Sequence, residues 1–63
     1  MLKDNLTYYR TKAGLSKTKL AKMSGVSRET IKHIELYDQD NVFVSTLEKL
    51  SKALNITIQD LIK

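Results

Sequence analysis

Apolar residues recur every three or four positions through most of the 63-residue chain, and glycine or polar residues separate the segments with this spacing. Leu2, Leu6, Tyr9 and Ala13 carry the pattern in the first segment. Such spacing places the apolar side chains on one face of an amphipathic helix. The chain is therefore predicted to be all-α, with helices at about 2–13, after Ser16, at about 28–36, at about 44–54 and after Thr57.

Residues that favour helix ends lie between these segments. Gly14 and Gly25 adopt the left-handed backbone conformation without strain, and we expect them to end the first and second helices. Ser16 and Ser27 have hydroxyls that accept backbone N–H bonds, so they are predicted to cap the second and third helices. The last two helices are framed by Ser45 with Glu48, a capping-box match, and by Thr57 with Asp60.

The length and composition exclude several classes of protein. A chain of 7.2 kDa has room for one domain, over residues 1–63, and not for a deep catalytic cavity. The absence of cysteine excludes disulfides and cysteine-based zinc sites, and one histidine without a second ligand predicts no metal. Neither a glycine-rich phosphate loop nor paired carboxylates are present, so no enzyme, cofactor or small-molecule effector site is expected. No apolar run reaches the ~20 residues of a membrane span, which predicts a cytoplasmic protein.

The charge is concentrated in the middle of the chain. The formal net charge is +4, but residues 10–33 hold seven basic side chains against Glu29 alone, a net charge of +6. Residues 34–63 hold five acidic and three basic side chains, a net charge of −2, and residues 1–9 are neutral. A basic segment of this kind is typical of a surface that binds a polyanion such as nucleic acid. The alternative is a solvated, lysine-rich surface.

Residues 17–36 have the spacing of a helix-turn-helix, two helices joined by a short turn. Ala21 is small enough for the crossing of the two helices, and Gly25 occupies the turn position that needs a positive φ. Val26 and Ile31, together with Leu20 and Ile34, are the apolar positions that hold the pair together. This combination indicates the motif much more specifically than a helix, turn and glycine alone.

The sequence resembles the Cro/C1-type (XRE-like) helix-turn-helix repressors of bacteria and phages. The resemblance extends from Leu6 to Leu61 and implies a compact five-helix bundle of the lambda-repressor-like type. It also implies sequence-specific binding of double-stranded DNA and transcriptional regulation, with the helix at 28–36 reading the major groove. The segments that carry it are Arg10–Ser16, Leu20–Ser27, Ile34–Glu35 and Thr46–Ile56.

The expected reading face of the third helix follows from its buried face. At 100° per residue, Ile31 and Ile34 point inward and leave four side chains outward for base readout, namely Arg28, Glu29, Lys32 and His33. Arg28 suits guanine and Glu29 suits cytosine, whose N4 donates to a carboxylate. The resemblance places the family's third base-reading position at His33. Alternatives remain for three of these side chains. Arg28 and Lys32 could pair with Glu29 or simply keep the helix surface solvated, and Lys32 could contact a phosphate. Glu29 could serve only to complement the helix dipole.

The resemblance also implies structural and phosphate-binding roles. It pairs Arg10 with Glu35, which links the first helix to the end of the third. It places Lys17 against a phosphate, where the family usually has glutamine. Ser27 and Thr30, at the start of the third helix, are further candidates for contact with a phosphate or a thymine methyl.

The chain departs from the family between Leu36 and Val42, where the usual glycine, basic residues and proline are replaced by a segment with two aspartates, Asp38 and Asp40. That segment and the next helix contact phosphate in the family. Here either the loop swings away, or backbone N–H groups near Phe43 and Val44 make the contact. The apolar run 42–44 is interpreted as the hydrophobic entry to the fourth helix, because one such run makes no sheet.

Assembly and partners leave two alternatives open. Monomers of this size make few base contacts, so the resemblance implies a dimer on a palindromic operator. Ile58 and Ile62 share a face of the last helix and are the candidates for a homodimer contact, unless both complete the core. The competing function is a protein-interaction module, such as an antitoxin or antirepressor, which Leu36, Tyr37 and the acidic loop favour.

Overall fold

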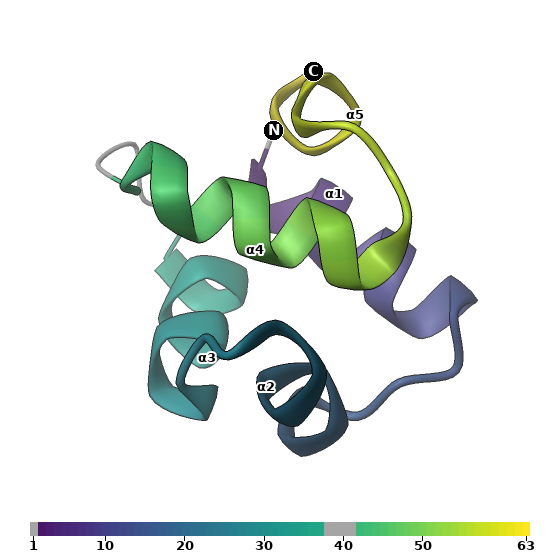
Figure 1. The fold of residues 1–63 in the computed structure, drawn as a ribbon, viewed down its shortest axis with the longest axis vertical. Helices are drawn as coiled ribbons and strands as arrows, with labels where there is room; N and C mark the ends of the chain where they lie inside the picture. Colours follow the sequence, from purple (N-terminus) through teal and green to yellow (C-terminus); the bar gives the residue numbers. More distant parts are fainter. Residues whose placement is uncertain (1, 38–41) are drawn as a thin grey trace.

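The computed structural model describes residues 2–37 and 42–63. Within these ranges the chain forms helices and no strand, as the apolar spacing predicts (Figure 1). The second and third helices pack together at one end of the molecule, and the fifth lies at the opposite end beside the first (Figure 1). The five helices are α1 (Leu2–Lys12), α2 (Lys17–Ser24), α3 (Arg28–Tyr37), α4 (Val44–Leu54) and α5 (Ile58–Ile62).

All five helices contribute to one hydrophobic core. Six side chains are fully buried, and every helix supplies at least one of them. Burial of such a side chain contributes about 1.5–3 kcal/mol, so a small chain gains most when each helix turns its apolar stripe inward. The expected compact bundle is therefore confirmed. The six residues are Leu6, Leu20, Ile31, Ile34, Leu50 and Leu61.

The turn between α2 and α3 has the predicted geometry. Gly25 adopts φ 77° and ψ 9°, in the left-handed region, and its N–H donates to the Ala21 carbonyl at 2.9 Å. The next residue, Val26, is buried, and its N–H donates to Ser24 Oγ at 3.1 Å. The turn therefore ends α2 and directs the chain into α3 within three residues.

Gly25→Ala should lower the free energy of unfolding by about 1 kcal/mol, because an L-residue is strained at this positive φ. A Cβ added at Gly25 would meet nothing within 4 Å, so the expected cost comes from the backbone alone. Urea denaturation followed by circular dichroism measures the change. Lys22→Ala, at an exposed position of α2, is the control and should change stability by less than about 0.5 kcal/mol. If the two variants were equally stable, an alanine at position 25 would not be strained by the positive φ.

The cap of α4 and the end of α1 differ from the prediction, although α4 spans the predicted residues 44–54. The predicted Ser45–Glu48 capping box was wrong, because α4 starts at Val44 and its N-cap is Phe43, which makes no side-chain cap bond. Ser45 therefore lies inside the first turn, where its hydroxyl cannot take the N-cap place. The apolar face of the first helix is also one residue shorter than predicted: α1 ends at Lys12, and Ala13 is exposed in the turn before Gly14.

The short helix α5 is held at both ends. Thr57 and Asp60 form a capping box in which each side chain accepts a hydrogen bond from the other's backbone N–H, at 3.1 and 3.0 Å. The bond from the Thr57 N–H lowers the pKa of the Asp60 carboxyl. At the other end, Asn5 Nδ2 donates to the Leu61 carbonyl at 2.8 Å. The last helix is thus fixed to α1, and Leu61 is fully buried.

Candidate nucleic-acid interface

The outer face of α3 carries the four side chains expected to read bases. Arg28, Glu29, Lys32 and His33 are all exposed, while Ile31 and Ile34 on the inner face are fully buried. The predicted orientation of the helix is therefore correct. Two cationic groups, a carboxylate and an imidazole give this face hydrogen-bond donors and acceptors that suit base edges.

Arg28 and Glu29 form a weak, exposed ion pair. Arg28 Nη1 lies 4.0 Å from Glu29 Oε1, and the two side chains are 55% and 72% exposed. Exposed pairs of this kind contribute about 0–1 kcal/mol, because solvent screens them and both side chains lose rotamer freedom. The alternative in which Arg28 only pairs with Glu29 thus has its contact, but this ion pair is too weak to keep either side chain from another partner.

The start of α3 uses the hydroxyls of Ser27 and Thr30. Ser27 Oγ accepts from the Thr30 N–H at 3.1 Å and donates to Thr30 Oγ1 at 2.8 Å. The predicted cap at Ser27 is confirmed. The Ser27 hydroxyl thus has two partners within α3 before any anion binds. The Thr30 hydroxyl accepts the bond from Ser27 Oγ and keeps its own hydrogen for a further acceptor.

Helix α2 adds positive charge beside this face. Its predicted cap is present, since Ser16 Oγ accepts from the Lys19 N–H at 3.0 Å. The helix begins at the partly buried Lys17, contains no acidic residue, and carries Lys19 and Lys22 exposed. Because α2 and α3 pack against each other, the helix that carries these exposed lysines adjoins the one that carries Arg28 and Lys32. The pair of helices suits a polyanion.

A nearly buried ion pair anchors α3 from behind. Arg10 Nε lies 2.7 Å from Glu35 Oε2, and Nη2 lies 2.9 Å from Oε1, so the contact is bidentate. Only 13% of the Arg10 side chain and 5% of the Glu35 side chain are exposed. The hydrogen bonds that Arg10 donates to the Glu35 carboxylate raise the pKa of the Arg10 guanidinium. The predicted pair is present, and it neutralises an acid that would otherwise oppose the basic face.

Arg10 also makes a contact that sequence reasoning missed. Its Nη1 donates to the Leu15 carbonyl at 2.8 Å, in the segment between α1 and α2. One guanidinium therefore connects α1, the α1–α2 connection and α3. No residue pattern identifies a backbone carbonyl as a partner, since every residue has one.

The start of α4 presents apolar side chains and uncapped backbone. Phe43 and Val44 are 79% and 65% exposed, so they do not form the hydrophobic entry expected there, whereas Val42 packs partly against the core. The N-cap of α4, Phe43, makes no side-chain cap bond, so among the described residues no side chain is found on the first-turn N–H groups, which are open to an anion. Asp38 and Asp40, on which the loop alternatives depend, lie outside the described residues.

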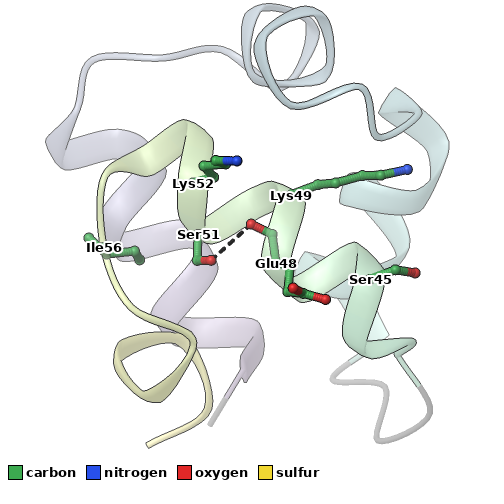
Figure 2. A pocket seen from close by; sticks show the side chains of 6 residues that line it. All are labelled: Ser45, Glu48, Lys49, Ser51, Lys52 and Ile56. Atoms are coloured by element: carbon green, nitrogen blue, oxygen red, sulfur yellow. Dashed lines mark hydrogen bonds between the residues drawn. The ribbon is translucent and has the colours of Figure 1, made fainter.

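A shallow hollow of about 490 Å³ lies along α4 and reaches Ile56 beyond its end (Figure 2). The hydrogen bond from Ser51 Oγ to the Glu48 carbonyl occupies its only nearly buried hydroxyl. Both charge signs occur along it, so it does not present one convergent set of groups to a ligand. It is lined by Ser45, Glu48, Lys49, Ser51, Lys52 and Ile56.

Two other kinds of site are not found. Residues 2–37 and 42–63 contain no group of three or more histidine, cysteine, aspartate or glutamate side chains that would hold a metal ion. No helix within the same ranges has the length and apolar character needed to cross a membrane.

Comparison with known proteins places these features among DNA-binding regulators. The model of the family described as "Helix-turn-helix" matches residues 6–61. The control protein C.SmaI of Serratia marcescens is 39% identical over 62 residues, which cover 98% of this chain and 73% of that protein.

Solved structures agree in fold. SinR, a master regulator for biofilm formation crystallised in complex with DNA, matches with a TM-score of 0.93 and 30% identity, and the match covers all of both chains. The N-terminal DNA-binding domain of SinR from Bacillus subtilis has the same TM-score and identity, over 100% of this chain and 91% of that one. The restriction-modification controller protein C.AhdI from Aeromonas hydrophila matches with a TM-score of 0.87 and 34% identity, over 97% and 91% of the two chains.

Proposed function

Because the chain belongs to the helix-turn-helix family and is a DNA-binding transcription regulator, we propose that it represses transcription by binding a specific double-stranded operator with α3 in the major groove. The observation that supports this best is the exposed polar face of α3 beside the lysines of α2. A DNA reader needs base-specific groups and phosphate-directed charge on the same surface. As a regulator of this kind it would work in the cytoplasm, without a metal or cofactor.

Four residues of α3 read bases in this proposal. Arg28 donates two hydrogen bonds to guanine O6 and N7, for which its weak pairing with Glu29 leaves it available. Glu29 accepts from cytosine N4, the contact that offsets its repulsion from phosphate. His33 and Lys32 lie one turn further along the exposed face, where His33 contacts a base and Lys32 a base or a phosphate.

Phosphate contacts flank this reading face. Lys17 contacts the backbone as a point charge from the start of α2. Thr30 donates its hydroxyl hydrogen, while Ser27 contributes chiefly by capping α3. First-turn N–H groups at Phe43 and Val44 bind a further phosphate, which the absence of a side-chain cap on α4 supports.

We further propose that the protein binds a palindromic operator as a dimer, in which the two copies contact each other through α5. Ile58 packs partly against the core, whereas Ile62 is 49% exposed, so Ile62 is the centre of the contact. A contact centred on one exposed isoleucine buries too little surface to hold a dimer by itself. Dimerisation is therefore expected to be weak in solution and to be completed on the operator.

A protein-interaction module is the second candidate function. Four apolar side chains at the end of α3 and the start of α4 are half exposed or more, which is unusual for so small a domain. They would suit a protein partner such as a toxin or another regulator, with DNA binding as a secondary activity. The four are Leu36, Tyr37, Phe43 and Val44.

Selection of bound duplexes from a random pool of about 20 base pairs tests the proposal. We expect enrichment of an inverted repeat whose half-sites lie about one helical turn apart. Affinity for the selected duplex should fall with salt with a log–log slope of about −4 to −5, since about four to six phosphates are neutralised. Enrichment of a single half-site would exclude the dimer but leave operator reading in place. No enrichment would exclude operator reading and favour the protein-interaction module.

A further inference from the structure

The rings of His33 and Tyr37 are in contact on the outer face of α3. Their centroids lie 5.3 Å apart and the ring planes are inclined by 46°. Both side chains are exposed, Tyr37 by 64% of its surface. Aromatic rings at this separation and tilt attract one another.

The helix geometry explains how the two rings meet. Residues four apart lie on the same face of a helix, and long side chains lean toward its N-terminus. Tyr37 therefore leans back over His33 from the C-terminal side. This contact restricts the rotamers of His33 while its other edge stays accessible. The contact thus holds the imidazole on the exposed side of α3, which also carries Arg28 and Glu29.

Packing does not account for Tyr37. It lies outside the set of side chains that form or pack against the core. In the described part of the chain its hydroxyl makes no hydrogen bond, and its contact with His33 is the interaction found for it. The tyrosine is therefore expected to matter little for stability, and the ring contact found for it within the described residues is the one with His33.

We propose that Tyr37 is a positioning residue for base recognition, which holds the His33 imidazole in the orientation that reads a base. The inference rests on the proposed function and adds a residue that base-reading spacing does not identify. A side chain already restricted in the free protein loses less rotamer freedom on binding, so the correct base is favoured more strongly. Tyr37 itself contacts no base in this scheme.

The first test uses the free protein. The ring protons of His33 are followed by NMR in the wild type, Tyr37→Phe and Tyr37→Leu. Since a tyrosine ring displaces the resonances of nearby protons, we expect the displacement to persist in Tyr37→Phe and to disappear in Tyr37→Leu. Unchanged amide resonances of core residues show that each variant is folded. His33 signals that are identical in the wild type and Tyr37→Leu would overturn the proposal.

The second test uses the selected duplex and its single-base variants. His33→Ala should reduce discrimination at one base pair, and Tyr37→Leu should reduce it at the same base pair by about two- to twelvefold, the range of an aromatic pair. Tyr37→Phe should retain it. Tyr37→Leu should have no further effect when combined with His33→Ala. The matched control is Tyr8→Leu, which removes another exposed tyrosine, on α1, and should leave discrimination unchanged.

The possible failures are distinguishable. If the wild type selects no duplex, the proposed function fails and this inference fails with it. If it selects one, but Tyr37→Leu changes another base pair or acts equally in the His33→Ala background, the tyrosine contacts DNA or a partner itself, and only this inference is overturned. The same holds if His33→Ala leaves every base preference unchanged.

Discussion

Glu35→Ala is expected to lower the free energy of unfolding by about 3 kcal/mol, since it leaves Arg10 nearly buried without its charge partner. The guanidinium loses two short hydrogen bonds and keeps the bond to the Leu15 carbonyl. A domain of this size has about 3–9 kcal/mol of stability in total, so the loss is a large part of it. Urea denaturation followed by circular dichroism measures the change.

Two variants serve as controls for this effect. Glu35→Gln retains one acceptor for Arg10 and should cost less than Glu35→Ala. Glu29→Ala removes a glutamate from the same helix, but one that is 72% exposed, and should change stability by less than about 0.5 kcal/mol. A loss below about 1 kcal/mol in Glu35→Ala would mean that water replaces the carboxylate, and that the pair does not anchor α3.

Arg28→Ala is expected to weaken binding to the selected duplex by about 1–3 kcal/mol, or about 5- to 150-fold, with little change in stability. The free energy comes from two hydrogen bonds to one guanine, so the preference at that base pair should be lost and the others kept. Arg28 is exposed and lies outside the core, which makes misfolding of the variant unexpected. Titration of labelled duplexes, with each base pair changed in turn, measures both effects.

Lys17→Ala is the matched control, because it removes a cation from the neighbouring helix rather than from α3. We expect it to weaken all sequences alike and to reduce the salt slope by about 1. Arg28→Ala would have a different role if it also weakened every sequence equally. The side chain would then contact phosphate, and another residue of α3 would read the guanine.

Much of this molecule follows from short-range patterns in the sequence. The five helices follow from apolar spacing of three and four, and the turn between α2 and α3 follows from the backbone freedom of Gly25. The inward face of α3 follows from Ile31 and Ile34, which settles which side chains point outward. The Ser45–Glu48 error shows the limit of such patterns, since the same residue pair two positions after the true N-cap has the same sequence as a real capping box.

The pairing of Arg10 with Glu35 came from resemblance to a family, because no local rule joins residues 25 apart. The sequence by itself determined the helices, their inner faces and the basic helix-turn-helix, because these depend on backbone preferences and on neighbours within about one turn. Only the tertiary structure decided that Arg10 also holds the Leu15 carbonyl, that Asn5 holds the end of α5, and that Ile58 is partly buried while Ile62 is exposed. These contacts depend on how the helices cross, which is set by the packing of the whole core.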